Sequence, residues 1–191
     1  MNFTSIDFET ANRSRVSICA AGIAVFEHGI LMEAPYWLVR PPKGHGWFLE
    51  EFTEGCHGLT WFDVQEAPEF STIAPDFLER LSRSDFVIAH NAPFDIGALR
   101  AILNHFSLAY PDFEYFCTWR VAERIWPELP GHKLGTLAAH IGHEFHYHHA
   151  QSDAEAADRV LLTMMKRANA DTPSELLQNA RVEARRFCQE K

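Results

Sequence analysis

The sequence predicts a mixed α/β fold built on a five-stranded sheet. Short apolar runs bounded by turn residues are typical of strands, and longer segments with apolar residues at helical spacing are typical of helices. Three strand-like runs come first, and helices then alternate with two further strands. The chain has 191 residues, of which 47% are hydrophobic, so it can form one domain with a substantial core.

The first three strands are expected close to the start of the chain. Residues 2–8 form a short apolar run, and residues 17–26 are rich in small and β-branched side chains. The His-Gly pair at 28–29 is a turn signal. We therefore expect residues 17–26 and 30–39 to form an antiparallel hairpin.

Helices and two more strands are expected in the following part of the chain. Thr60, Ser71, Thr118 and Ser152 are placed to cap four of the helices, because their hydroxyls can accept hydrogen bonds from free backbone N–H groups. The predicted strands are 85–89 and 114–117, and the predicted helices are 61–65, 71–81, 93–106, 118–126, 134–141 and 153–166.

The tail of the chain differs from the rest in charge. Residues 166–191 hold six basic and four acidic residues, whereas residues 1–165 hold eleven and twenty-two. We therefore predict a domain over 1–165 and a C-terminal helical extension over 166–191. A capping box over 172–175 begins the predicted helix, which would continue to Cys188. Two interpretations stay open: a helix docked on the domain, or a basic strip that binds nucleic acid or a partner.

Composition argues against several classes of protein. The net charge of −9 is unfavourable for coating long duplexes, but it suits an enzyme whose acids hold cations at one strand end. No apolar stretch approaches the ~20 residues of a membrane span, and no signal peptide is visible, so we expect a cytoplasmic protein with no membrane partner. The four cysteines form no C-x-x-C pair, which argues against a zinc ribbon or a redox motif.

Four acidic residues lie at boundaries of the predicted elements. Asp7 and Glu9 are two residues apart on a strand, so both carboxylates face the same side. Asp95 and Asp153 each open a helix, where a carboxylate is also simply favourable for the helix dipole. Taken together, the four supply the oxygen ligands that Mg²⁺ prefers, at the positions where α/β folds build their sites. The sequence therefore predicts a site for two divalent cations.

A histidine-rich loop precedes the last of these acids. His148 lies five residues before Asp153, and an imidazole with a pKa near ~6.5 can take a proton from water at neutral pH. A zinc hydrolase that uses this loop is an alternative, although no cysteine accompanies the histidines and the spacing does not match a helical His pair with a Glu base. The other histidines of the loop are His140, His143, His146 and His149.

Three segments resemble the exonuclease motifs of the DnaQ-like, DEDDh superfamily. They are Asp7-Phe8-Glu9-Thr10, His90-Asn91-Ala92-Pro93-Phe94-Asp95 and His148-x-Ala150-x-x-Asp153-Ala154. Residues 56–60 and Lys133-Leu134-x-x-Leu137 resemble the branch similar to the epsilon proofreading subunit of bacterial DNA polymerase III. The likeness spans the predicted domain. It implies a ribonuclease-H-like fold with a mixed sheet and helices on both faces.

The resemblance also implies an activity and a set of functional residues. The protein would be a metal-dependent 3'-5' exonuclease that uses two divalent cations, Mg²⁺ or Mn²⁺, and releases nucleoside 5'-monophosphates. The metal ligands would be Asp7, Glu9, Asp95 and Asp153, with His148 as the general base. Residues that would contact the terminal nucleotide are Thr10, His57, Asn91 and Phe94.

The expected substrate is a single-stranded or unpaired DNA 3' end. Few readers of base edges are evident, and an aromatic side chain such as Phe94 could stack on the last base, although it could equally be a core residue. An RNA-trimming exoribonuclease of the same superfamily is one alternative. A non-catalytic nucleic-acid-binding module is another, against which the intact set of five residues argues.

Phe8 stands where the family often has Thr or Ile, and it should point away from the metals. Association with a polymerase or with a second copy is left undetermined.

Overall fold

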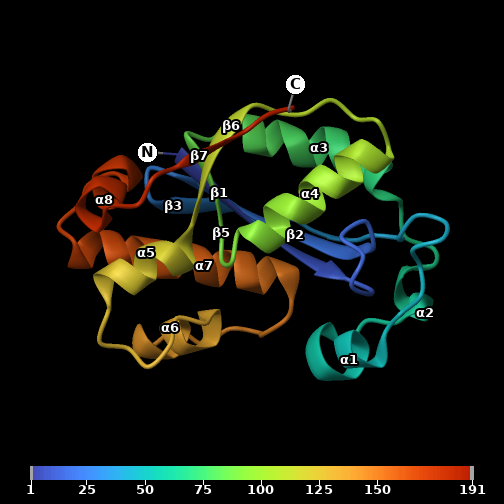
Figure 1. Cartoon of the computed structure of the whole chain (residues 1–191), viewed down its shortest axis with the longest axis horizontal. Helices are drawn as coiled ribbons and strands as arrows, with labels where there is room; N and C mark the ends of the chain where they lie inside the picture. Colours follow the sequence, from blue (N-terminus) through green and yellow to red (C-terminus); the bar gives the residue numbers. More distant parts are fainter. Residues whose placement is uncertain (1, 190–191) are drawn as a thin grey trace.

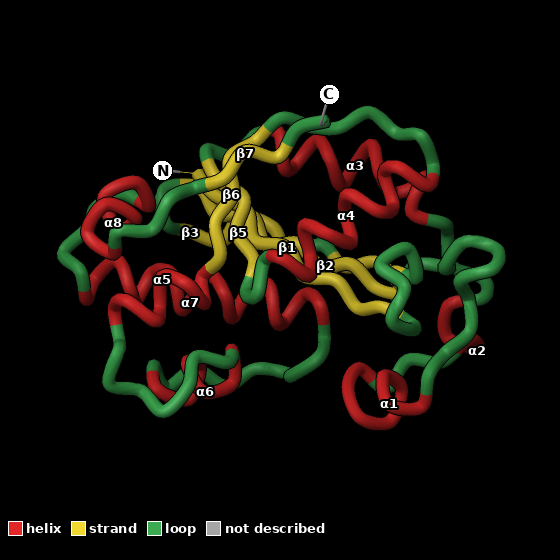
Figure 2. The backbone as a smooth tube through the Cα atoms, viewed as in Figure 1, coloured by secondary structure: helices red, strands yellow, loops and turns green. Residues whose placement is uncertain are grey.

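A mixed sheet runs through the middle of the molecule, with helices on both faces (Figure 1, Figure 2). The structure is a computed structural model of the whole chain, and it describes residues 2–189. The predicted mixed α/β class is confirmed, but the sheet has seven strands in the described residues rather than five. Residue 1 and residues 190–191, the outer ends of the predicted domain and extension, lie outside the described residues.

The strands of the sheet are β1 Asn2–Thr10, β2 Ile18–Glu27, β3 Ile30–Glu33, β4 Tyr36–Leu38, β5 Phe86–Ala89, β6 Phe113–Cys117 and β7 Arg185–Phe187. Their order is β3-β2-β1-β5-β6-β7, and β4 also pairs with β2. β1, β5 and β6 are parallel to one another, whereas β2 and β7 run antiparallel to their neighbours β1 and β6.

The predicted strand over 30–39 is divided into β3 and β4. Both pair antiparallel with β2, and Ala34 and Pro35 separate them. Proline has no N–H to give to the strand ladder, so a continuous strand cannot run through it in this pairing. Its carbonyl still accepts a hydrogen bond from the N–H of Ile23 at 3.1 Å. The antiparallel pairing with β2 is therefore kept on both sides of Pro35 and interrupted at that residue.

The helical segments are α1 Glu50–Phe52, η1 Thr53–His57, α2 Trp61–Val64, α3 Phe70–Ser82, α4 Pro93–His105, α5 Thr118–Ile125, α6 Leu134–His140, α7 Ala150–Arg167 and α8 Pro173–Ala180. α3 and α4 cover one face of the sheet, and α7 lies on the other face with α5, α6 and α8 packed against it (Figure 1). The helical segment formed by α1 and η1 was not predicted. None of the described helices is both long enough and apolar enough to cross a membrane.

Alternate residues of β1 enter different layers of the core. Phe3 belongs to the apolar cluster under α7, whereas Phe8 packs against Phe77 of α3, with ring centroids 5.3 Å apart. Asp7 and Glu9 lie on the same side of the strand as Phe3. Phe8 therefore points away from the two carboxylates, as expected from the sequence.

Only one of the four predicted helix caps, Thr60, stands at the N-cap position, where it forms a capping box with Asp63 at the start of α2. The N–H and hydroxyl of Thr60 both donate to the Asp63 carboxylate. Ser71, Thr118 and Ser152 lie inside the first turns of α3, α5 and α7, so their prediction as caps was wrong. The hydroxyl of Thr118 instead contacts His90, in the connection between β5 and α4. The hydroxyl of Ser152 accepts a hydrogen bond from the N–H of His146 in the histidine-rich loop.

The tail is helical only in its first part. α8 ends at Ala180, so the predicted helix reaching Cys188 was wrong, and β7 follows it at the edge of the sheet. Phe187 of β7 is fully buried, and its ring stacks on those of Tyr110 and Phe113 at centroid distances of 5.2 and 4.9 Å. This burial outweighs local helix propensity. The division of the chain at residue 165 stays a prediction.

Candidate metal and active site

A cavity of about 490 Å³ opens where β1 and β5 end and α7 begins. Because β1 and β5 are adjacent and parallel, their carboxyl ends meet at the same edge of the sheet. The residues that follow these strands therefore share one site with the first turn of α7. All of the predicted catalytic residues line this cavity: Asp7, Glu9, Asp95, His148 and Asp153.

A glycine in β2 allows α7 to approach the sheet. Gly22 pairs with Asp7 across the β1–β2 ladder. A Cβ atom at Gly22 would lie 2.2 Å from the carbonyl carbon of Ala150, the first residue of α7. Only glycine leaves room for the helix backbone here, and this close approach places Asp153 beside Asp7. This role of Gly22 was not predicted, and the run of small residues around it is the feature of the sequence that indicates it.

Two of the four acidic side chains, Glu9 and Asp153, form with His148 a group whose spacing suits a cation, whereas Asp7 and Asp95 line the same cavity outside this group. Glu9, His148 and Asp153 each offer a ligand atom, and these atoms lie within 4.8 Å of one another. Asp95 Oδ1 accepts a hydrogen bond from the N–H of Phe8 at 3.0 Å, which orients that carboxylate. Asp153 Oδ1 is buried and has no hydrogen-bond partner among residues 2–189. A buried oxygen without a partner is costly, and a hard cation would satisfy it.

Burial raises the pKa of all four carboxyl groups. It is the main cause for Glu9, whose pKa is raised to about 8 with further contributions from the charges of Asp153 and Asp95. Burial also raises the pKa of Asp153 to about 7. The pKa values of Asp7 and Asp95 are raised in the same direction, again mainly by burial. Bringing these groups together is unfavourable unless protons or cations offset their charge.

His148 lies at the mouth of the cavity in an uncommon backbone conformation. Its φ of 61° is left-handed, which few residues other than glycine adopt and which is often found at functional sites. The ring of Tyr147 packs edge-on against its imidazole, with centroids 4.2 Å apart. Burial lowers the pKa of His148, so the imidazole is neutral near pH 7. A neutral ring has a nitrogen lone pair that can accept a proton.

The other histidines of the loop do not gather around a metal. His149 stacks on Tyr36 at 4.4 Å and is not among the residues that line the cavity. His140 packs edge-on against the ring of Trp126. In the described part of the chain, the candidate ligand group contains a single histidine, His148. A zinc site made of several histidines therefore does not form here.

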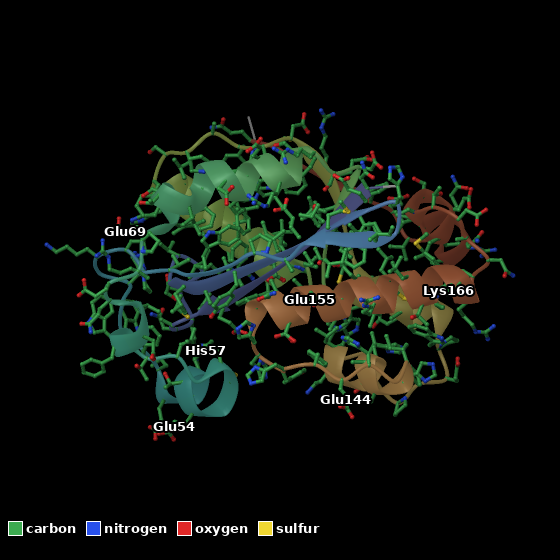
Figure 3. All side chains as sticks on the ribbon, turned by 180° about the vertical axis from the view of Figure 1, so that it is seen from behind. Glu54, His57, Glu69, Glu144, Glu155 and Lys166 are labelled. Atoms are coloured by element: carbon green, nitrogen blue, oxygen red, sulfur yellow. The ribbon has the colours of Figure 1, made fainter. Side chains whose placement is uncertain are left out.

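Three of the four residues predicted to contact the nucleotide line the cavity, namely Thr10, Asn91 and Phe94. His57 does not. Its Nε2 lies 3.1 Å from the carbonyl of Thr10, and its Nδ1 accepts from the N–H of Leu59 at 3.0 Å. The carbonyl can only accept, so Nε2 carries the proton. Figure 3 shows His57 on the helical segment near the ends of the strands. Its bond to Thr10, which lines the cavity, connects this segment to β1.

Several aromatic and polar residues complete the walls of the cavity. Trp119 packs near His90, with ring centroids 5.5 Å apart, and its indole N–H donates to Glu123 at 3.0 Å. These residues were not predicted to belong to the site, although some of the lining residues, among them Cys56, His90, Lys133 and Leu134, lie within the motif segments. The additional lining residues are Phe8, Phe52, Cys56, His90, Trp119, Lys133, Leu134 and Tyr147.

Comparison with known proteins identifies related sequences. Residues 46–161, more than half of the chain, match the RNase_T family, described as an exonuclease family. The PolC-type DNA polymerase III of Oceanobacillus iheyensis is 32% identical over 120 residues, which are 62% of this chain and 8% of that protein. The 3'-5' exonuclease DinG of Bacillus subtilis is 27% identical over 169 residues, 86% of this chain and 18% of that protein. The chain thus spans less than a fifth of these relatives.

Solved structures share the fold at lower sequence identity. Exonuclease X, in complex with 5' overhanging duplex DNA, is 21% identical with a TM-score of 0.73, covering 93% of this chain and 99% of that one. The nuclease domain of 3'hExo, a DEDDh family member bound to rAMP, is 16% identical with a TM-score of 0.70, covering 86% of this chain and 92% of that one. The predicted ribonuclease-H-like fold is confirmed, and the chain belongs to the RNase_T exonuclease family.

Proposed function

We propose that this protein is a 3'-5' exonuclease that hydrolyses the last phosphodiester bond of a DNA strand and releases nucleoside 5'-monophosphates. One observation carries the proposal: four acids from β1, α4 and α7 meet in one cavity beside His148. Membership of an exonuclease family supports the same activity. In this proposal residues 1–165 form the catalytic domain.

Two divalent cations, Mg²⁺ or Mn²⁺, would be held by Asp7, Glu9, Asp95 and Asp153. Bound there, they would supply positive charge to the scissile phosphate and to the leaving 3' oxygen. The donor set supports this assignment, because carboxylate oxygens are preferred by hard cations. The partnerless Asp153 Oδ1 and the raised pKa values of the four carboxyl groups support it too. Each indicates negative charge that residues 2–189 offset only in part, since Arg15 near Asp95 is the one cation that acts on these carboxyl groups.

The chain's own side chains would place the substrate and move the proton. His148 would accept the proton of the attacking water at its free ring nitrogen, and the ring of Tyr147 would hold the imidazole in place. Phe94 is half-buried against the core, and the Arg15 guanidinium lies 6.0 Å from its ring centroid. A braced ring of this kind can stack on a terminal base without selecting a sequence. Thr10 and Asn91 would contact the terminal nucleotide beside it.

Single-stranded or unpaired DNA is the substrate we favour. The relatives named above are a DNA polymerase and an exonuclease, which is consistent with DNA and with association with a polymerase. RNA trimming is the second candidate, because structural relatives include a nuclease domain bound to rAMP and an exonuclease described with a histone mRNA stem-loop. A non-catalytic binding module is disfavoured, since it would not need all five residues of the site.

A degradation assay tests the proposal. A 5'-labelled single-stranded DNA should shorten from its 3' end in Mg²⁺ or Mn²⁺, and EDTA should stop the reaction. RNA of the same sequence and a blunt duplex should be degraded more slowly. Asp7→Asn should abolish hydrolysis and keep the circular dichroism spectrum, whereas the exposed Asp171→Asn should keep the activity. Shortening from the 5' end, or full activity of Asp7→Asn, would refute the proposal.

A further inference from the structure

A second cavity, of about 650 Å³, adjoins the candidate active site. Its lining residues come from β6, α5, the start of α4 and the segment that joins α8 to β7. Figure 1 shows where these elements lie. Asn91 and Phe94 line the active-site cavity, whereas Ala92 and Pro93, which lie between them in the chain, line the second cavity. Trp119 lines the first cavity, and the next residue, Arg120, lines the second. The two cavities therefore meet along two segments of the chain.

Arginine side chains dominate this second cavity, which we call the basic cleft. Arg120 and Arg124 come from α5, and Arg181 and Arg185 come from the tail. Two acids, Glu123 and Glu183, also line it. The whole chain carries a net charge of −9, so a local excess of positive charge reverses the overall balance. Such a reversal beside a catalytic cavity indicates an anionic ligand.

Most of these arginines lack an acidic partner among residues 2–189. Arg120 lies 3.3 Å from Glu123, but Arg124, Arg181 and Arg185 form no ion pair within residues 2–189. All four are exposed. Arg186, by contrast, is paired, because its guanidinium donates to the carboxylate of Asp112 across the β6–β7 edge. Three exposed guanidinium groups that share one cavity without partners repel one another, and a polyanion would relieve this repulsion.

The backbone of the tail holds its two arginines at the cleft. Arg185 is in register with Tyr115 of β6, which also lines the cleft. Arg181 ends α8 in a left-handed conformation with a φ of 54°, which turns the chain from the helix towards β7. The buried ring of Phe187 anchors this strand. The tail is thus docked on the domain and also basic, so the two interpretations of its sequence are compatible.

We propose that the basic cleft binds the phosphate backbone of the single strand that leads away from the active site. This inference rests on the proposed function. A strand whose 3' end lies in the catalytic cavity must leave it in its 5' direction, and the adjoining cleft offers guanidinium groups, which bind phosphates through paired N–H donors. The cleft thereby makes the affinity for the substrate depend on strand length.

The test is an equilibrium binding measurement with single-stranded DNA of 3 and of 15 nucleotides, in Ca²⁺ in place of Mg²⁺. The variant combines Arg124→Gln, Arg181→Gln and Arg185→Gln. The control removes the same charge elsewhere, by Arg83→Gln, Arg159→Gln and Arg167→Gln, which are exposed and line neither cavity. The cleft variant should bind the 15-mer at least about tenfold more weakly than wild type, with a salt slope lower by about two.

Binding of the 3-mer by the cleft variant should change less than about twofold, and the control should resemble wild type with both lengths. A cleft variant that binds the 15-mer as tightly as wild type would overturn the inference, as would an equal loss in the control. The p-nitrophenyl ester of thymidine 5'-monophosphate separates the two proposals, because it occupies the catalytic cavity alone. Equal hydrolysis by wild type and cleft variant is expected. If wild type cleaves neither the ester nor DNA, the proposed function is contradicted. The dependence of binding on strand length would then still decide whether the basic cleft binds the single strand.

Discussion

His148 and His149 are neighbours in the chain with different surroundings. His148 lines the cavity with its imidazole against Tyr147, whereas His149 stacks on Tyr36 outside it. Their separation follows from the left-handed φ of His148, which turns the chain just before α7. The motif spacing already favoured His148 as the base, and the contacts give that preference a physical reason.

We predict that His148→Ala lowers kcat by about 10²- to 10⁴-fold, the usual contribution of a general base. His149→Ala should lower kcat far less, because it removes only the stacking on Tyr36. Steady-state hydrolysis of a 3'-labelled single strand measures both variants, with thermal unfolding as the check on folding. Equal losses in the two variants would show that the base is misassigned.

Asp158 is a buried acid that the catalytic site does not use. Its Oδ2 lies 2.7 Å from the hydroxyl oxygen of Ser5, which also lies 2.8 Å from the carbonyl of Ala154. Ser5 has one hydroxyl proton and must give it to the carbonyl, which can only accept. Both bonds therefore form when Asp158 is protonated and donates to Ser5. Burial raises the pKa of Asp158 well above its ordinary value, which agrees with this assignment.

This raised pKa makes stability depend on pH. An unfolded Asp titrates near ~3.9, so above that pH the folded protein holds a proton that the unfolded chain has lost, and stability falls as pH rises towards the folded pKa. Asp158→Asn is neutral at every pH, and its amide can donate to Ser5. Its urea midpoint should exceed that of wild type at pH 8, and the difference should shrink as the pH falls towards 4. The exposed Asp171→Asn serves as the control and should show no such trend. A constant difference across this range would mean that Asp158 titrates normally.

At the scale of elements, the site depends on how closely α7 lies on β2. The contact is made backbone to backbone, at Gly22 and Ala150. It sets the position of the first turn of α7, and hence of Asp153, relative to the β1 carboxylates. A substitution at Gly22, which has no side chain, should therefore change the position of Asp153 and affect the site.

We predict that Gly22→Ala destabilises the fold by about 1–3 kcal/mol or more, because its Cβ would overlap the backbone of α7. It should also weaken activity, since the helix must move away from β1. Urea unfolding and the degradation assay measure the two effects. Gly131→Ala is the matched control, because no atom lies within 4 Å of the Cβ it would add. Wild-type stability of Gly22→Ala would show that the helix can shift at no cost.

At the scale of the whole molecule, the tail extends the sheet. β7 adds an edge strand next to β6, and its Phe187 ring lies between Tyr110 and Phe113, with the Arg100 guanidinium 4.9 Å from its centroid. Residues near the end of the chain thus belong to the core and to the wall of the basic cleft. Folding and substrate binding are connected through this strand.

Phe187→Ala should destabilise the protein by about 3–5 kcal/mol, the usual cost of removing a buried aromatic ring. Phe187→Leu, which keeps most of the apolar volume, should cost less. Arg186→Gln removes an exposed ion pair with Asp112 and should leave stability nearly unchanged. Chemical denaturation measures all three. A Phe187→Ala protein as stable as wild type would mean that β7 is dispensable.

The amino-acid pattern was sufficient to predict the mixed α/β class and a set of acids and a histidine that share one cavity. This was possible because strand and helix periodicity are local, and because each functional residue stands at an element boundary within a short motif. Tertiary structure alone decided the break at Pro35, the contact at Gly22, the strand at Phe187 and the assembly of the basic cleft. These features depend on which distant segment lies alongside, and burial against that segment outweighs the local preference of the chain.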